Sequence, residues 1–338
     1  MTKKPFIIPV FLPQEGCPHA CVFCNQRAAT GIRDPSPLEP EGVRAAVEEF
    51  SRHRGPGRER AEIAFYGGNF LGLPEERVRA LLAAAALCVK EGLADGIRIS
   101  TRPDTLIPAR LDLLSGFPVR CIETGAQSLD DAVLAACGRG HSAADVEKAA
   151  AEVKARGMAL GIHLMAGLPA ETRDSAGASA RKTAELRPSF VRIHPTLVLL
   201  GSGLEALWRR GEYEALSLAE AVFRVRIMYE TLAAAQIPVA RMGLFSPEPG
   251  SVLAGPEHPA FGHLVMSAVF LEKARALLQS AGVKGGEAAF RVHPRDVSNL
   301  RGQANQNLRT LSGDFGLAGV RVIPDPALSP GELALSPA

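Results

Sequence analysis

Three cysteines near the start of the chain carry the strongest chemical signal in the sequence. Cys17, Cys21 and Cys24 follow a Cys-x3-Cys-x2-Cys pattern within residues 16–25. Their thiolates can converge only if the backbone folds back, and Gly16 and Pro18 favour such a loop. Convergent thiolates are soft ligands that select zinc or an iron–sulfur cluster. The spacing therefore predicts a metal site in this loop.

The number of thiols bears on which metal the loop would hold. A structural zinc site takes four protein ligands, commonly from a second Cys or His pair. No such pair follows in the sequence, although a zinc loop completed by a distant histidine remains an alternative. Three thiolates favour a 4Fe–4S cluster with one iron left open to a ligand that is not protein.

The cysteine pattern, with the aromatic Phe23 before the third cysteine, resembles that of the radical S-adenosylmethionine (SAM) enzymes. The resemblance implies that the amino and carboxylate groups of SAM chelate the open iron. It also implies that the reduced cluster cleaves the sulfonium to give a 5′-deoxyadenosyl radical, which abstracts hydrogen. An electron donor such as flavodoxin or ferredoxin is the partner that this chemistry implies.

From residue 16 to about residue 262 the chain resembles the radical domain of the Elongator catalytic subunit and its short bacterial relatives. The matching segments are residues 65–70, 100–104, 123–128, 139–141, 195–198 and 207–213. The order of motifs also resembles oxygen-independent coproporphyrinogen oxidases. Two departures concern single residues, because Asn69 stands where threonine is usual and Ser100 where glutamate is more frequent. The longer cysteine gap and the acetyltransferase domain of the Elongator subunit are not expected here.

The resemblance also implies roles for individual side chains. Gly67 and Gly68 would let backbone approach the methionine amino group, Gln127 suits ribose hydroxyls, and Arg139 can fork onto the carboxylate. Arg139 as a surface cap on the preceding helix is the alternative. The residues expected to bind cofactor are Phe23, Gly67, Gly68, Asn69, Thr101, Gln127, Arg139 and His163. The candidates for catalysis are His163, His194, Arg192, Arg102 and Arg241.

The elements that must position these residues alternate between strand and helix. Strands are predicted at residues 6–12, 62–66, 97–101, 119–123, 159–164, 190–194 and 239–242. Such alternation predicts an α/β fold with parallel pairing, here a partial (βα)6-type TIM barrel. The candidate residues follow the strand ends, where a parallel barrel places its active site. We expect the radical SAM barrel over residues 1–254, a small C-terminal α/β appendage over 255–328 and a loose tail over 329–338. Within the appendage, one helix is predicted over residues 296–311.

Composition narrows the classes of function. The net charge is +2, so no bulk charge indicates nucleic acid or a membrane. No apolar run reaches the ~18 residues that a membrane span needs, and the first residues do not resemble a signal peptide. Cys88, Cys121 and Cys137 lie too far apart in sequence to suggest a disulfide framework, and Cys137 is expected to be a buried thiol rather than a spare ligand. We therefore expect a cytoplasmic protein.

Four arginines in the appendage bear on the substrate. Arg291, Arg295, Arg301 and Arg309 have Asp296 as the only acidic residue in their segment. They could contact phosphates, or form an ordinary solvated face. Three functions remain open: radical chemistry on RNA such as tRNA, the same chemistry on a small molecule, and a non-enzymatic cluster or haem carrier. The cofactor residues disfavour the carrier, and the arginines favour RNA.

Overall fold

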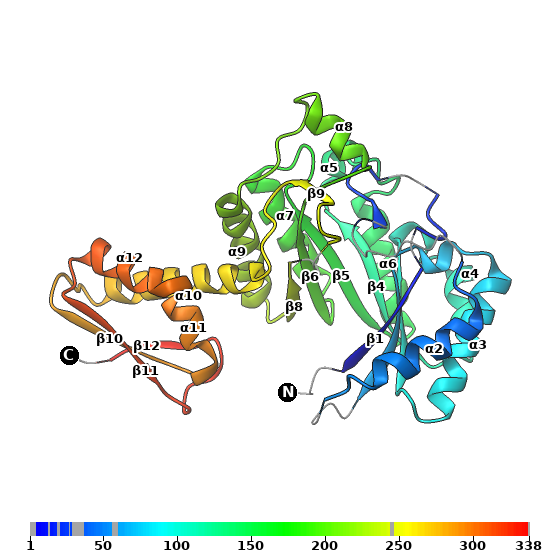
Figure 1. The fold of residues 1–338 in the computed structure, drawn as a ribbon, viewed down its shortest axis with the longest axis horizontal. Coiled ribbons are helices and arrows are strands. Elements are labelled where there is room, and N and C mark those ends of the chain that lie inside the picture. The colour runs from blue at the N-terminus through cyan, green and yellow to red at the C-terminus, as the bar shows by residue number, and fades with distance from the viewer. Residues whose placement is uncertain are drawn as a thin grey trace.

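The main body of the protein is a curved parallel sheet of seven strands. The computed structural model describes residues 5–12, 14–18, 21–26, 28, 37–55, 60–243 and 247–336. In sheet order the strands are β1 (Phe6–Phe11), β2 (Ala61–Tyr66), β3 (Gly96–Thr101), β4 (Val119–Gln127), β5 (Ala159–Ala166), β6 (Phe190–Pro195) and β8 (Val239–Met242). Every neighbouring pair is parallel. The expected α/β partial barrel is confirmed, and β8 adds a seventh strand after the first six (Figure 1).

Helices cover the outer face of this sheet (Figure 1). They are α2 (Pro40–Ser51), α3 (Glu75–Lys90), α4 (Pro108–Leu111), α5 (Asp131–Ala136), α6 (Ala143–Ala155), α7 (Arg173–Glu185) and α9 (Leu218–Ala234). Local chemistry fixes their starts, as in α6, where Ser142 and Asp145 form a reciprocal capping box. The core between sheet and helices is largely aliphatic and buried, with Ile63, Ile97 and Ile162 from the strands. None of the described helices combines the length and the apolar character that crossing a membrane requires.

A short antiparallel ribbon lies over the carboxyl edge of the sheet. It pairs β7 (Val198–Leu199) with β9 (Val252–Ala254), and α8 (Gly203–Arg209) follows β7. Residues that follow β7 hold the cysteine loop through two hydrogen bonds. Asn25 Nδ2 donates to the carbonyl of Leu200 at 2.7 Å, and Leu204 N donates to the carbonyl of Val22 at 2.6 Å. The cysteine loop is thus fixed by residues almost two hundred positions away.

The C-terminal part has a hydrophobic core of its own. Helix α10 (Phe261–Ser280) starts against the main core with Phe261 and Val265, and continues into a second core around Phe270 and Phe290. The other elements are β10 (Glu287–Val292), α11 (Val297–Arg301), α12 (Gln306–Phe315), β11 (Gly319–Pro324) and β12 (Leu333–Leu335), with sheet order β11-β10-β12. Because α10 contributes to both cores, the division at residue 254 stays a prediction.

Two expectations for this region were wrong. The single helix expected over residues 296–311 is two helices, because the backbone turns at Gly302, whose φ of 69° favours glycine. The stretch expected as a loose tail contains β12, which pairs antiparallel with β10. Leu333 and Leu335 pack against the second core, so burial stabilises a strand too short to be recognised from its sequence.

Candidate active site

A cavity of about 610 Å³ opens at the carboxyl edge of the sheet. Its described lining joins the cysteine loop to residues of six neighbouring strands, β1 to β6. The predicted site residues found there are Cys17, Cys21, Phe23, Cys24, Gly67, Gly68, Thr101, Arg102, Gln127, Arg139, His163, Arg192 and His194. The structure thus brings together residues from distant parts of the chain, as the strand-end positions predicted. Asn69 and Arg241 are the two predicted residues that do not line this cavity.

The three thiols of the loop differ in exposure. Cys17 is exposed, Cys24 is half-buried and Cys21 is buried. Burial, followed by the neighbouring Cys21 and Cys17, raises the pKa of Cys24 to about 12. Metal ligation by such a thiol must therefore displace its proton. Among the described residues, no three His, Cys, Asp or Glu side chains are arranged to hold a metal ion. His19 and Ala20 of the loop lie outside the described residues.

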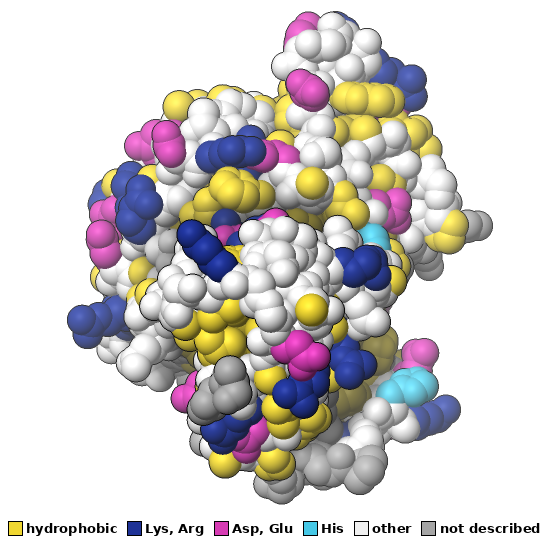
Figure 2. Space-filling view, turned by 90° about the vertical axis from the view of Figure 1, so that its left-hand side faces the viewer, with side chains coloured by type: hydrophobic (Ala, Val, Ile, Leu, Met, Phe, Trp, Pro, Cys, Tyr) yellow, Lys and Arg dark blue, Asp and Glu magenta, His cyan; other side chains and the backbone are white. Residues whose placement is uncertain are grey.

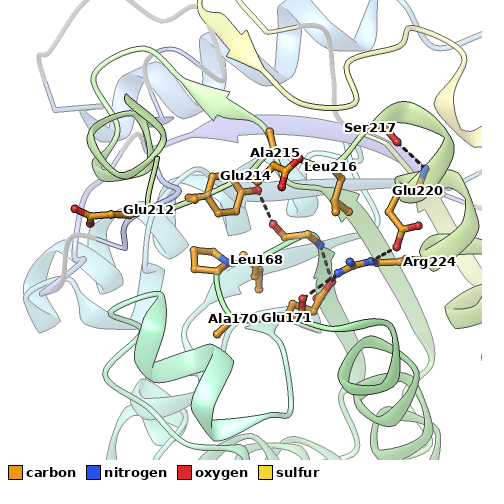
Figure 3. A pocket seen from close by; sticks show the side chains of 13 residues that line it. Leu168, Ala170, Glu171, Glu212, Glu214, Ala215, Leu216, Ser217, Glu220 and Arg224 are labelled. Carbon is orange, nitrogen blue, oxygen red and sulfur yellow. Dashed lines mark hydrogen bonds and ion pairs between the residues drawn. The ribbon is translucent and has the colours of Figure 1, made fainter. Parts of the chain in front are cut away.

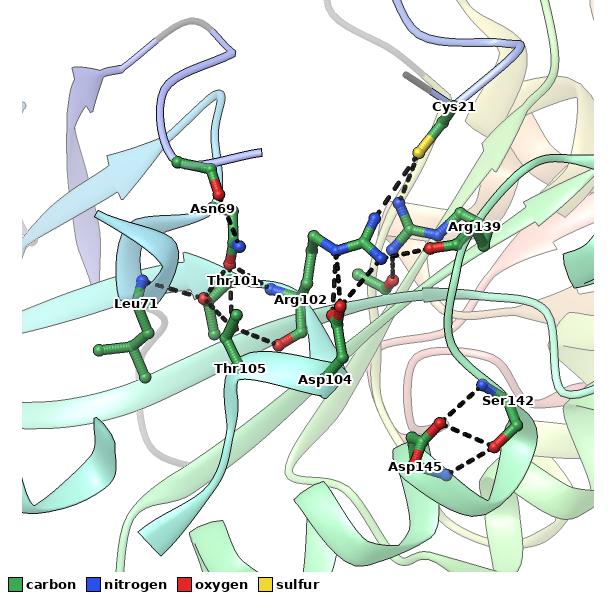
Figure 4. Close-up of polar contacts among 12 residues, drawn as sticks. Cys21, Asn69, Leu71, Thr101, Arg102, Asp104, Thr105, Arg139, Ser142 and Asp145 are labelled. Carbon is green, nitrogen blue, oxygen red and sulfur yellow. Dashed lines mark hydrogen bonds and ion pairs between the residues drawn. The ribbon is translucent and has the colours of Figure 1, made fainter. Parts of the chain in front are cut away.

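Two arginines converge on the Cys21 sulfur (Figure 4). Arg139 Nη1 lies 3.1 Å from Sγ, and its Nη2 donates to the carbonyl of Gly125. Arg102 Nη1 lies 3.8 Å from the same sulfur. Arg139 is only 5% exposed, so the alternative of a surface helix cap was wrong. Its buried Nε has no hydrogen-bond partner among the described residues.

Asn69 was expected to bind cofactor, but the structure gives its side chain a different environment. It is fully buried, and its Nδ2 donates to the carbonyl of Gly16 at 2.9 Å. Its Oδ1 accepts from Thr101 Oγ1 at 2.6 Å, Thr105 Oγ1 at 2.9 Å and Arg102 N at 3.0 Å (Figure 4). The turn after β2 thus directs this amide away from the cavity. Asn69 ties the start of the cysteine loop to the end of β3.

The paired glycines before Asn69 serve backbone packing. Gly67 has a φ of 94°, a conformation that side chains disfavour. A Cβ at Gly68 would lie 2.5 Å from the Glu15 carbonyl oxygen and 2.6 Å from that of Leu12. Both glycines line the cavity, but the close approach at Gly68 is to the strand and loop that lead into the cysteines. The lack of a side chain at Gly68 allows this close packing, which positions the cysteine loop.

Glu123 organises the floor of the cavity, although the sequence analysis gave it no role. Its side chain is fully buried and accepts from Tyr66 Oη at 2.7 Å, Arg98 Nη1 at 2.7 Å and Arg192 Nη2 at 3.1 Å. His163 Nε2 also contacts its carboxylate. Burial opposes ionisation, but the His163 hydrogen bond and the arginine charges hold the pKa of Glu123 well below its usual range. An acidic residue within a strand, directly after the apolar Cys121 and Ile122, was the signal that could have identified it.

His194 and Arg241 differ in their relation to the cavity. Nδ1 of His194 lies 3.1 Å from the carbonyl oxygen of Gly243. A carbonyl only accepts, so Nδ1 carries the hydrogen and Nε2 is left as an acceptor. Burial, followed by the nearby His163, lowers the pKa of His194 to about 3, so the ring is neutral at pH 7. Arg241 of β8 lies opposite Arg192 of β6 in the sheet register. Its Nε donates to the Gly243 carbonyl at 3.1 Å, and the residue does not line the cavity.

A second cavity, of about 480 Å³, contains none of the predicted site residues. It lies between the loop after β5 and the loop before α9, and Figure 3 shows Arg224 between Glu171 and Glu220. Burial raises the pKa of Glu171 to about 7, even though Gly167 N donates to it at 2.7 Å. Nearby, Cys137 is a fully buried free thiol packed with Leu168, in agreement with its expected state.

Two of the four C-terminal arginines have partners that the sequence did not suggest. Arg291 forms an ion pair with Asp325, with Nε 2.8 Å from Oδ2, and Arg309 donates to the Ala304 carbonyl at 2.5 Å. Asp296 is buried and accepts from the Gly331 amide at 2.8 Å instead of facing the arginines. Figure 2 shows basic and acidic side chains interspersed over the face in view. A paired arginine has less free charge for phosphate.

Comparison with known proteins gives a consistent family assignment. A model described as the radical SAM superfamily matches residues 11–182, and a radical SAM C-terminal domain matches residues 188–269. An uncharacterized protein of Methanocaldococcus jannaschii is 28% identical over 303 residues, covering 86% of this chain and 89% of its own. The tRNA uridine(34) acetyltransferase of Dehalococcoides mccartyi is 27% identical, covering 58% and 50%. Human Elongator complex protein 3 is 26% identical, covering 65% and 48%.

A solved structure supports the fold. Methanocaldococcus infernus Elp3, with residues 1–46 deleted, superposes with a TM-score of 0.61 at 22% identity, covering 80% of this chain and 63% of that one. The chain spans about half the length of the Elongator and acetyltransferase relatives. The first family model alone covers half of the sequence, including the cysteine loop and the residues of β2 to β5 that line the cavity. The chain belongs to the radical SAM superfamily of enzymes.

Proposed function

We propose that Cys17, Cys21 and Cys24 hold a 4Fe–4S cluster and that SAM binds beside it in the cavity. The observation that carries this proposal is the meeting of three thiols from one loop with the buried guanidinium of Arg139 in a single cavity. The donor set fits, because thiolates are the usual ligands of such clusters. The unpartnered Nε of Arg139 fits an anionic ligand, which a carboxylate would supply.

When bound, the cluster and SAM supply a 5′-deoxyadenosyl radical through one-electron cleavage of the sulfonium. The chain's own residues orient the reactants. Arg139 holds the methionine carboxylate, and Gln127 hydrogen-bonds the ribose. Gln127 has a φ of 69°, a backbone conformation that costs energy and recurs at ligand sites. Phe23 provides an apolar surface at the cavity wall.

The substrate binds at the end of the cavity away from the cysteines. There His194 offers Nε2 as a hydrogen-bond acceptor, and Arg192 offers donors. Glu123 holds Arg192 and His163 in place from below. Because the His194 ring stays neutral, it can accept from a substrate N–H or O–H without changing charge across the physiological pH range. Arg241 has no role in this part of the proposal.

The substrate class we favour is RNA, and specifically tRNA. Support comes from the names of the matched relatives, which include tRNA uridine(34) acetyltransferases in bacteria and archaea. A small-molecule substrate is the second candidate, favoured by the ion pairing of Arg291 in the appendage. A flavodoxin or ferredoxin would supply the electron.

The two substrate classes can be separated in one assay. Reconstituted protein is incubated anaerobically with SAM and dithionite, and with either bulk tRNA or an RNA-free metabolite extract. Formation of 5′-deoxyadenosine above the substrate-free rate, with a mass change in a tRNA nucleoside, supports RNA. Stimulation by the metabolite extract alone, unaffected by ribonuclease, favours the small molecule. Binding of tRNA that does not weaken with salt would also count against RNA.

A further inference from the structure

Arg102 lines the cavity beside Cys21. Its side chain is 4% exposed, and Nη1 lies 3.8 Å from Sγ of Cys21 (Figure 4). A guanidinium is always charged at physiological pH. A buried, permanent positive charge therefore lies against the thiol that we assign as the central cluster ligand.

Arg102 is held from several sides, so its position is fixed. Nε donates to Asp104 Oδ1 at 2.9 Å, and Nη2 donates to Asp104 Oδ2 at 3.1 Å. Nη2 also donates to the carbonyl of Arg139. The backbone N of Arg102 donates to Asn69 Oδ1 at 3.0 Å, which links it to the start of the cysteine loop. These contacts leave Nη1 directed at the Cys21 sulfur.

We propose that Arg102 sets the reduction potential of the cluster. The inference rests on the proposed function, in which Cys21 ligates iron. One-electron reduction by an external donor adds a single negative charge to the cluster and moves no proton. A fixed positive charge and an N–H directed at a ligand sulfur stabilise that added charge, most strongly where water is excluded. Arg102 therefore makes the cluster easier to reduce.

Arg139 lies closer to the same sulfur but serves a different purpose. Its Nε has no partner among the described residues, and its guanidinium is the group available for the SAM carboxylate. A bound SAM carboxylate would offset the charge of Arg139 only while SAM is present, whereas Asp104 offsets part of the Arg102 charge at all times. Arg102 keeps its position whether or not SAM is bound, because its partners belong to the protein. Asp104 acts against it, since its negative charge opposes the effect of Arg102.

Because Arg102 and Asp104 carry opposite charges, removing either charge should shift the reduction potential in opposite directions. Wild type, R102Q, R102K and D104N are reconstituted anaerobically without SAM, and each is titrated with redox dyes while the reduced cluster is followed by electron paramagnetic resonance. R102Q should shift the equilibrium toward the oxidised cluster at least tenfold, which lowers the midpoint potential by about 59 mV for a one-electron couple. D104N should shift it the other way. R102K keeps the charge and should lie between R102Q and wild type.

The matched control is R209Q, which removes an arginine from the surface of α8. Its side chain is 58% exposed and paired with Glu205, so the midpoint should equal that of wild type. A full cluster with an unchanged midpoint in R102Q overturns the proposal. So do shifts of the same sign in R102Q and D104N, which would indicate a loosened loop. If R102Q takes up no iron, an unchanged or lowered midpoint in D104N still overturns it. A wild type without a cluster would instead refute the proposed function.

Discussion

Substitution of Asn69 by alanine tests how the cysteine loop is positioned. The change removes one donor and one acceptor from a fully buried site, leaving the Gly16 carbonyl and the Arg102 N–H without their partner. A buried polar group left unsatisfied costs about 1–3 kcal/mol, so two such groups cost roughly 2–6 kcal/mol. Thr101 and Thr105 retain each other as partners at 2.9 Å, so their hydroxyls add little.

The assay combines stability with iron uptake. At roughly 2–4 °C per kcal/mol for a domain of this size, the apo-protein's unfolding midpoint should fall on the order of 10 °C. Cluster content after reconstitution should fall as well, because Asn69 ties the loop to β3. N69D tests the donor half of the contact. A carboxylate would still accept from Arg102 N, but it would place an acceptor against the Gly16 carbonyl and bury a charge, so N69D should lose at least as much stability as N69A.

Asn307 in the second core supplies the matched control. It is also buried, and its Nδ2 donates to the Ser267 carbonyl at 2.9 Å and the Asn299 carbonyl at 3.2 Å. N307A should destabilise the protein comparably while leaving cluster content at the wild-type level. Wild-type stability and full iron in N69A would refute the reasoning. Equal iron loss in N69A and N307A would show that iron uptake follows global stability alone.

Two further predictions concern buried carboxylates. E123Q leaves the buried charge of Arg192 without its carboxylate, while Arg98 keeps its ion pair with Glu62. The substitution should cost about 3–5 kcal/mol in urea unfolding at pH 7, and the exposed control E212Q should stay within ~0.5 kcal/mol. A loss under ~1 kcal/mol in E123Q would contradict the network. Glu171 has a pKa raised from 4.5 to about 7, so the folded state holds a proton that the unfolded state releases, and stability should fall as pH rises through that window. E171Q should remove that fall, and parallel curves for wild type and variant would contradict it.

Much of the site could be predicted because parallel strands impose a common edge. Once the strands were recognised, the residues that follow them had to meet, and Thr101, Gln127, His163 and His194 do line one cavity. The cysteine loop was equally predictable, because its chemistry depends on local spacing. Periodicity and motif position therefore sufficed for the strand ends and for the grouping of the site residues.

The sequence did not allow us to predict which way a single side chain points at a turn. Asn69 follows the paired glycines and looked like a cofactor ligand, but its amide is used by backbone groups from two other segments. The Glu123 network was not predicted for a similar reason, because its partners come from four different strands. Strand β12 was missed because its stability depends on pairing with β10 and on packing against the second core.

The most direct test of the central claim is anaerobic SAM cleavage with dithionite, measured as 5′-deoxyadenosine by mass spectrometry. Wild type should form 5′-deoxyadenosine and methionine in equal amounts, even without substrate. The variant with Cys17, Cys21 and Cys24 all changed to alanine should hold no cluster and form none. C88A, which removes a buried thiol on α3, should keep both iron and cleavage. Wild-type iron content or cleavage in the triple variant would contradict the account.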